Sequence, residues 1–290
     1  MNADRQSAYH LERVSGSSEV DADLFAATRL YMVEDLGLDP RFAERRSQQE
    51  LQRKIPKAVL HLLLKAGVVI EGRDVLDLGA GLGALSEELL LNGARLHSLE
   101  PGAAWANLTR RRLERHGRGF DLLLAAGESI PLPDRSVDLI VSLQVLEHVQ
   151  DPEQVLAEAW RVLRPGGHFY LACENYLAFW EPHYCLPWLP LLPKSLGALY
   201  LRALGRSPVF LMESITYTTF PGVVRHCRKL GFLRQRDEEL VENLHSGRGL
   251  KWRAMRALAA GFGAGLPRWL DDARHSFRIG IHELMRKPEA

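Results

Sequence analysis

Cysteine is scarce in this chain, and the three that occur do not form a pattern. Cys173, Cys185 and Cys227 are too few and too scattered for a disulfide framework, and none forms a C-x-x-C pair. The start of the chain has no apolar signal core, and no stretch approaches the ~20 uninterrupted apolar residues of a membrane span. These absences predict a protein of the reduced cytoplasm.

An excess of charge of either sign is also missing. The chain of 290 residues has 37 Lys and Arg against 36 Asp and Glu, which gives a net charge of +1. No basic field is available to hold a phosphate backbone, so nucleic acid is not expected as a partner and a small molecule fits better. With 46% hydrophobic residues, the composition is that of one globular catalytic domain with additions.

A glycine-rich turn follows a short apolar segment. The segment Val75–Gly83 reads V-L-D-L-G-A-G-L-G, which predicts a buried strand running into a turn that opens a helix at Ala84. Gly79, Gly81 and Ala84 also satisfy the loose G-x-G-x-x-G/A pattern of dinucleotide folds, so the turn indicates a nucleotide without choosing which one.

Strand and helix patterns then alternate with short links. This alternation predicts a parallel sheet covered by helices on both faces. The expected strands are 74–78, 95–99, 120–125, 137–142 and 168–173, and the expected helices are 84–92, 103–115 and 152–163.

The flanking regions carry weaker patterns. Helical spacing of apolar residues over 21–36 and 48–65 predicts a helical cap at 1–70, before a main domain at 71–290 with an insert at about 176–215. After the insert we expect a helix over 219–230 ended by Gly231, a strand from about 232, a helix over 251–270 and a final strand over 277–285.

Four further motifs follow the glycine turn in order. Glu100 ends the second expected strand, Glu128 lies in a loop, Ser142–Val149 follows the fourth strand and Arg161–Gly167 precedes the fifth. As a set they resemble the class I S-adenosylmethionine-dependent methyltransferases, in particular the small-molecule branch with the ubiquinone and menaquinone biosynthesis enzymes. The resemblance implies a Rossmann-like, doubly wound α/β sheet of seven strands with the last antiparallel, and S-adenosyl-L-methionine as cofactor.

The resemblance also implies roles for individual residues. The glycine turn would pack against the methionine and ribose of the cofactor, and Asp77 would either steer the ammonium group or tie down the loop. Glu100 would accept both ribose hydroxyls. Leu143 would floor the sulfonium pocket. The implied cofactor site comprises Asp77, Gly79, Ala80, Gly81, Gly83, Glu100, Pro101, Gly127, Glu128, Ser142, Leu143 and Gln144.

One position departs from the family. Ala126 stands where an aspartate is usual in the adenine loop. Without the aspartate carboxylate, adenine recognition is left to the backbone N–H groups of Gly127 and Glu128 and to the apolar wall of the pocket.

Methyl transfer depends mainly on alignment, which can supply ~7–11 kcal/mol of the barrier. A hydroxyl acceptor also needs a base, and the histidines expected near the carboxyl ends of the strands are His148 and His183. The alternatives are a pocket-lining role for His148 and a surface loop for His183. An amine or an activated carbon would need no strong base.

The insert combines Trp180, Trp188 and several prolines, which exclude a continuous helix until Lys194. After Lys194, an apolar stripe predicts a lid helix packed on the core, an acceptor channel, or a peripheral membrane contact over 186–206. The stripe consists of Leu196, Leu199, Tyr200 and Leu204.

Together these features predict S-adenosylmethionine-dependent methyl transfer to a small, partly apolar acceptor, with O-methylation favoured. The alternatives are an NAD(P)-dependent Rossmann oxidoreductase and a non-catalytic binding protein on the methyltransferase fold. No metal is expected, because no ligand spacing such as H-E-x-x-H occurs. The oligomeric state is left open.

Overall fold

The structure is a computed structural model that describes residues 18–35, 40–235 and 280–289. Three expectations lie wholly or partly outside these residues: the first part of the helical cap at 1–70, the helix over 251–270 and the first residues of the final strand.

A single seven-stranded sheet organises the chain, in the order β3-β2-β1-β4-β5-β9-β8. The first five strands pair in parallel, while β9 runs antiparallel to both neighbours, β5 and β8. The predicted doubly wound sheet with an antiparallel last strand is therefore confirmed. The strands are β1 Asp74–Leu78, β2 Arg95–Leu99, β3 Phe120–Leu123, β4 Val137–Leu143, β5 Leu163–Glu174, β8 Leu233–Gln235 and β9 Gly280–Arg286.

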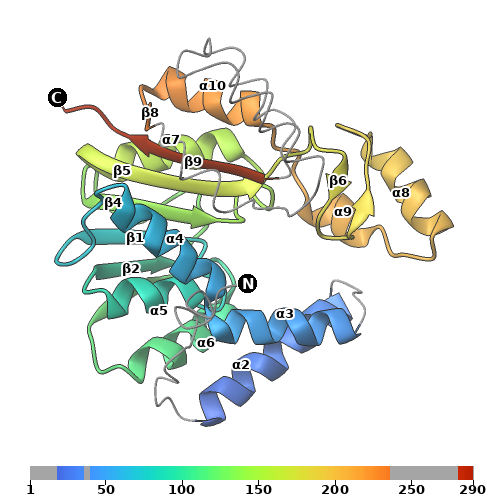
Figure 1. Ribbon diagram of the computed structural model, residues 1–290, viewed down its shortest axis with the longest axis horizontal. Coiled ribbons are helices and arrows are strands. Elements are labelled where there is room, and N and C mark those ends of the chain that lie inside the picture. Colours follow the sequence, from blue (N-terminus) through green and yellow to red (C-terminus); the bar gives the residue numbers. More distant parts are fainter. Residues whose placement is uncertain (1–17, 36–39, 236–279, 290) are drawn as a thin grey trace, which may run out of the picture.

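Helices cover both faces of this sheet (Figure 1). On one face lie α7 and α10, and on the other lie α4, α5 and α6. Each face has its own apolar core, so the central strands are buried on both sides, as expected for a parallel sheet. The helices are α4 Lys54–Lys65, α5 Ala84–Leu91, α6 Ala103–Glu114, α7 Pro152–Val162 and α10 Phe220–Leu230.

Helix α7 shows how the sequence sets local structure. The Asp151 side chain caps it by accepting a hydrogen bond from the Gln154 N–H at 3.0 Å, and Pro152 takes the first turn. The helix ends at Val162, one residue before its expected end, and β5 begins at once, earlier than the expected strand start at 168. A register shift between Val137 and Leu139 on β4 accommodates the irregular start of β5.

The expected single helix over 48–65 is wrong. The chain forms α2 Ser18–Leu30, a π-helical turn η1 at Tyr31–Asp35, α3 Pro40–Gln52 and then α4. Arg53 separates the last two with a φ of 52°. Its buried guanidinium lies 3.2 Å from Glu87 and 3.1 Å from Glu88 of α5, so ion pairing with the main domain accompanies the break.

The insert forms a small unit at one end of the sheet (Figure 1), which we call the lid, residues 176–215. It contains a two-stranded ribbon, β6 Trp180–Glu181 with β7 Leu186–Pro187, followed by α8 Lys194–Ala203 and α9 Val209–Ser214. Its own core includes buried Tyr176, Tyr184, Trp188, Leu201, Phe210, Leu211 and Ile215.

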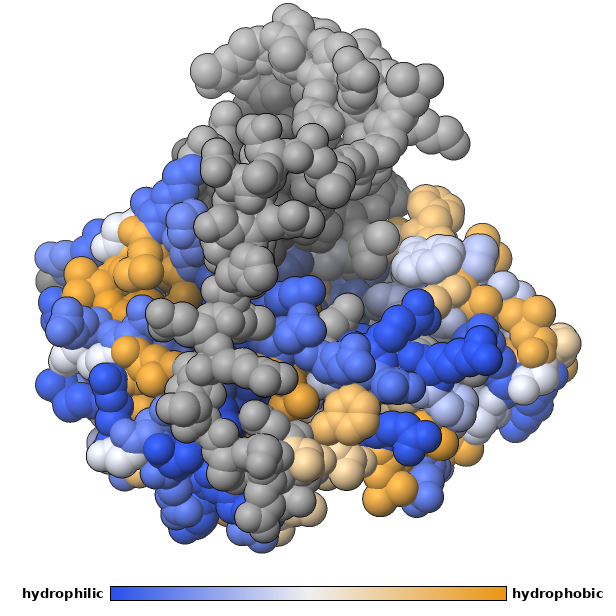
Figure 2. All heavy atoms as spheres, turned by 60° about the horizontal axis from the view of Figure 1, so that its bottom comes forward, coloured by the Kyte–Doolittle hydropathy of each residue, from blue (hydrophilic) through white to orange (hydrophobic). Residues whose placement is uncertain are grey.

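Three of the four residues of the predicted apolar stripe of α8 do not face this core, whereas the fourth, Tyr200, is half-buried and packs against it. Leu196, Leu199 and Leu204 are 53%, 63% and 48% exposed, while Gly197, Ala198 and Leu201 point inward. Glycine is required at position 197, because a Cβ there would lie 2.8 Å from the Trp188 ring. Hydrophobic and hydrophilic surface consequently alternate at this end of the molecule (Figure 2).

Across the described ranges, no helix is both long enough and apolar enough to cross a bilayer.

Candidate active site

The glycine loop lies at the carboxyl ends of β1 and β2. The N–H groups of Gly79 and Ala80 donate to the Leu99 carbonyl at 3.0 and 2.8 Å, which fixes the loop to the next strand. Gly79, Gly81 and Gly83 have φ values of 84°, 54° and 73°, a region that favours glycine. Nothing lies within 4 Å of a Cβ built on Gly81, so the loop has open space on this side.

Glu100 holds the loop from the end of β2. Its Oε2 accepts a hydrogen bond from the Gly81 N–H at 2.9 Å, and its Oε1 accepts one from the Gly102 N–H at 2.8 Å. Each carboxylate oxygen has a second lone pair, so the group still has acceptor capacity for two hydroxyls. Pro101, beside it, is exposed. This geometry fits the ribose role expected for Glu100.

Asp77 lies beneath the loop and is 1% exposed. It accepts a hydrogen bond from the Ser86 hydroxyl of α5 at 2.5 Å. Burial raises its pKa to about 7, against the effect of the Ser86 hydrogen bonds, and the charge of Glu100 adds to the rise. This placement favours the loop-tying interpretation over direct contact with an ammonium group.

The expected adenine loop lies between β3 and β4. Gly127 is buried, and a Cβ there would approach Val155 to 3.3 Å. The Glu128 carboxylate accepts from the Gln150 N–H at 3.0 Å, so its side chain joins the loop to the segment before α7. Ala126 is exposed, and adenine recognition through the backbone here remains a prediction.

The end of β4 supplies the remaining expected cofactor residues. Ser142 is 0% exposed and its Oγ has no hydrogen-bond partner, while Leu143 is half-buried and Gln144 has a φ of 57°. A bound nucleoside could form hydrogen bonds with the buried Ser142 hydroxyl and with the Glu100 carboxylate, and it could occupy the open space beside Gly81. The residues present therefore fit S-adenosylmethionine.

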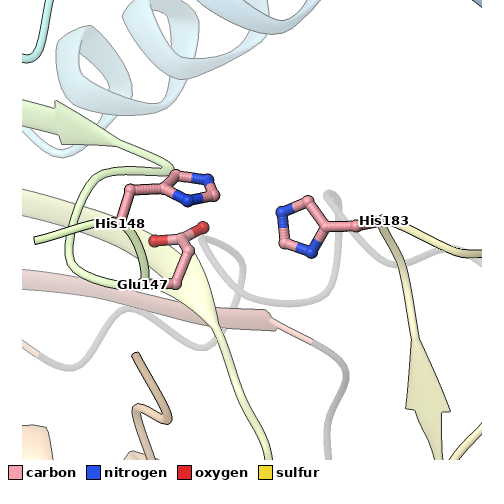
Figure 3. A group of neighbouring side chains, drawn as sticks. All are labelled: Glu147, His148 and His183. Atoms are coloured by element: carbon pink, nitrogen blue, oxygen red, sulfur yellow. The ribbon is translucent and has the colours of Figure 1, made fainter. Parts of the chain in front are cut away.

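Two histidines predicted separately meet beside this edge. His148 follows β4 and His183 comes from the link between β6 and β7, and their rings point toward each other with centroids 5.3 Å apart (Figure 3). Glu147 completes the group, with ligand-type atoms of all three within 4.8 Å of one another. We call these three residues the Glu-His-His cluster. The sequence analysis named both histidines but missed Glu147.

The two histidines differ in acidity. His148 reaches the surface, but packing against its ring and the charge of His183 lower its pKa, although the Ser214 carbonyl opposes the shift. Burial of the His183 ring works against its charge, yet the hydrogen bond to Glu181 and the nearby carboxylates outweigh this and raise its pKa. His148 is therefore the more readily neutral of the two rings, and only a neutral imidazole can accept a proton.

Buried carboxyl groups surround the cluster. Burial raises the pKa of Glu147 to about 8, and the charge of Glu174 adds to this rise. Glu174 lies at the end of β5, and burial raises its pKa to about 7. The Gln144 amide lies 2.6 Å from Glu174 Oε1 and 2.8 Å from Glu147 Oε1 and donates to both when its nitrogen faces them. This bridge links the end of β5 to the segment that follows β4.

The sheet order, the glycine loop and the strand-end acid are those expected of class I S-adenosylmethionine-dependent methyltransferases. Residues 76–171 match the family model described as a methyltransferase domain. The resemblance seen in the sequence is thereby confirmed, and the domain family implies S-adenosylmethionine as cofactor.

The similar proteins agree with this assignment. The chain is 34% identical over 142 residues to a Mycolicibacterium smegmatis protein named a probable S-adenosylmethionine-dependent methyltransferase, covering 49% of this chain and 53% of that one. It is 33% identical over 127 residues to the ubiquinone biosynthesis O-methyltransferase of a Methylobacterium species, covering 42% and 51%. The chain thus spans about half the length of the curated relatives it matches.

Solved structures support the fold. An S-adenosylmethionine-dependent methyltransferase from Mesorhizobium loti aligns with a TM-score of 0.50 at 19% identity, covering 75% of this chain and 92% of that one.

Proposed function

We propose that this protein transfers the methyl group of S-adenosylmethionine to an oxygen atom of a small, partly apolar acceptor and releases S-adenosylhomocysteine. The observation that carries the proposal is the Glu100 carboxylate, which holds the Gly81 and Gly102 N–H groups at the carboxyl edge of the sheet. The cofactor supplies an electrophilic methyl group on a sulfonium. The chain contributes binding, orientation and exclusion of water.

The acceptor is proposed to lie between the Glu-His-His cluster and the lid. The cluster follows β4, and the Thr216 N–H donates to the Glu147 carbonyl at 2.7 Å, so the end of the lid is tied to the same loop. Phe210 of the lid packs 5.7 Å from the His148 ring and 5.2 Å from the His183 ring. An acceptor here would meet polar groups on one side and aromatic side chains on the other, which suits a partly apolar molecule.

His148 is the proposed base for an acceptor hydroxyl. Its Nδ1 lies 2.9 Å from the Ser214 carbonyl, so Nδ1–H donates and Nε2 is left to accept a proton. Replacing His148 by Gln should lower turnover by about 10²–10⁴ while S-adenosylhomocysteine affinity is unchanged. Full turnover in both His148→Gln and His183→Gln, with chemistry rate-limiting, would show that the acceptor needs neither histidine.

Ligand binding separates this proposal from its rivals. Calorimetry with the whole chain should show binding of S-adenosylhomocysteine and none of NAD or NADP. Binding of the nicotinamide nucleotides instead would favour the oxidoreductase. A chain that binds S-adenosylhomocysteine but transfers no methyl group to any of a panel of phenols, alcohols and amines would be a binding protein.

Acceptor choice should respond to the lid. Trp180 is 39% exposed, whereas Trp188 is 3% exposed and belongs to the lid core. Apolar contacts discriminate by ~1–3 kcal/mol per methylene, so Trp180→Ala should change acceptor preference with little effect on S-adenosylhomocysteine affinity. Lost cofactor binding with unchanged selectivity would place the lid at the cofactor instead.

The outer face of the lid is also proposed to contact a membrane surface. Exposed Leu196 and Leu199 lie on α8 with exposed Arg202, and Arg206 follows the helix. Apolar side chains flanked by cations favour the interface of anionic bilayers. Sedimentation with anionic vesicles should be reduced in a Leu196→Ser, Leu199→Ser variant, and equal sedimentation of both proteins would exclude this contact.

A further inference from the structure

The Glu-His-His cluster contains an unsatisfied acceptor. Glu147 is 0% exposed, and its Oε2 has no hydrogen-bond partner. A buried carboxyl oxygen without a hydrogen-bond partner is costly whether or not the group is protonated, so such a group calls for a ligand. One nitrogen of His148 and one of His183 lie within 4.8 Å of a Glu147 carboxyl oxygen and of each other.

Both imidazoles are oriented to offer a lone pair. Nδ1 of His148 lies 2.9 Å from the Ser214 carbonyl, and Nδ1 of His183 lies 2.8 Å from Glu181 Oε1. Because Nδ1–H donates in each case, Nε2 is unprotonated in the neutral ring, and the rings face each other (Figure 3). Histidines that bind metals almost always use their second nitrogen in this way, toward a carboxylate or a backbone carbonyl.

The supporting carboxylate is itself held firmly. Glu181 is 0% exposed, and its Oε2 accepts a hydrogen bond from the Tyr184 N–H at 2.5 Å. The short β6–β7 ribbon therefore fixes both His183 and the group that orients it. This support distinguishes the cluster from a chance meeting of polar side chains on a surface.

We propose that Glu147, His148 and His183 bind a divalent first-row transition-metal ion and leave coordination positions open for the oxygen of the methyl acceptor. Two imidazoles and one carboxylate suit zinc, manganese or iron. Two ligand atoms about 2.0–2.2 Å from a tetrahedrally coordinated ion lie about 3.3–3.6 Å apart, so side-chain rotations that bring the atoms up to about 1.5 Å closer suffice. The expectation of no metal came from sequence spacing, which cannot reveal a ligand contributed by a distant lid.

The role of the ion rests on the proposed function. A hydroxyl bound to the ion loses its proton to solvent more readily, because the positive charge stabilises the oxyanion. The oxyanion then attacks the methyl carbon, the carbon–sulfur bond breaks and its electron pair stays on sulfur, which becomes a neutral thioether. When the ion is bound, His148 and His183 are its ligands and solvent takes the proton; the base role proposed for His148 applies to the site without an ion.

Metal binding can be measured without any acceptor. Calorimetry of the whole chain with Zn²⁺ alone should show one ion per chain, and Co²⁺ should give a visible spectrum with nitrogen and oxygen ligands. His148→Gln, His183→Gln and Glu147→Gln should each abolish this binding. Glu181→Gln, which keeps the ligands but weakens their support, should reduce affinity about 10- to 100-fold.

Two matched variants control for other binding. His226→Gln removes a histidine that pairs with Glu153 at 3.2 Å away from the cluster, and Cys185→Ser removes the exposed thiol near His183. Both should bind Zn²⁺ as the unchanged chain does. Circular dichroism and S-adenosylhomocysteine affinity verify that each variant is folded.

Three results would overturn the proposed ion site: no stoichiometric Zn²⁺, equal binding in the three cluster variants, or loss of binding in Cys185→Ser. S-adenosylhomocysteine affinity is measured in the same samples without metal. A chain that binds S-adenosylhomocysteine but fails to bind Zn²⁺ rejects the ion site and leaves methyl transfer standing, whereas a chain that binds Zn²⁺ but not S-adenosylhomocysteine does the reverse.

Discussion

Removal of the Glu100 side chain tests the cofactor site most directly. In Glu100→Ala the N–H groups of Gly81 and Gly102 lose acceptors at 2.9 and 2.8 Å, and the two expected ribose hydrogen bonds are lost as well. Hydrogen bonds to a charged group contribute about 1.5–3 kcal/mol. S-adenosylhomocysteine affinity should therefore fall roughly ten- to a hundredfold.

The assay is calorimetry with S-adenosylhomocysteine and with its 2′-deoxy analogue. The unchanged chain should prefer the ribose form, whereas Glu100→Ala should bind both alike, because the discriminating acceptor is gone. Asp121→Ala is the control, since that carboxylate pairs with His97 at 2.9 Å on the neighbouring strand. Unchanged affinity and an unchanged ribose preference in folded Glu100→Ala would refute the ribose role.

Three further predictions concern the loop and its support. Gly79→Ala should destabilise the fold by about 1–3 kcal/mol and weaken S-adenosylhomocysteine binding, because its Cβ would lie 2.3 Å from Val145 Cγ2; Val145→Ala should restore part of the loss in calorimetry. Asp77, whose pKa rises from 3.8 to about 7, stabilises the fold while protonated, so this stability is lost as pH rises from about 4 through 7. Urea unfolding of Asp77→Asn should lack that dependence. Glu87→Gln should lower the unfolding free energy by about 3–5 kcal/mol, because buried Arg112, 2.8 Å from Glu87, loses its counter-charge; an unchanged urea midpoint would contradict this.

The fold could be predicted from the sequence because its signals are local. The apolar run of β1 and the glycines after it specify a strand and a turn by short-range sterics, and the expected bounds of β1 and β2 match the structure. Asp151 and Pro152 likewise mark the start of α7 within a few residues of chain.

The errors have nonlocal causes. Arg53 breaks a helix that periodicity favours, and the ion pairs beside it come from α5, which is remote in sequence. The early start of β5 coincides with a register shift against β4, which no pattern within β5 reveals. Tertiary contacts override local propensity at both places.

The residues of the candidate site also fall into two groups, those that local sequence motifs identify and those that long-range contacts bring together. Glu100 and the glycine loop are close in sequence to the strands that place them, so a motif could identify them. His183 reaches His148 only because the link between β6 and β7 packs beside the segment that follows β4. The sequence pointed to Glu147 only through its position directly before His148, in the segment after β4. The lid brings His183 to these two residues, and this long-range contact could not be predicted from the sequence.

The position of β9 has a consequence for the order in which the protein can fold. This strand lies between β5 and β8, yet it is the last of the sheet in sequence. During synthesis, β5 therefore has an unpaired edge and β8 has no neighbour until residues 280–286 have been made. Pairings of such long sequence separation form slowly, and an open edge attracts other chains. A nascent chain halted before residue 280 should be prone to aggregate although every residue of the Glu-His-His cluster is already present.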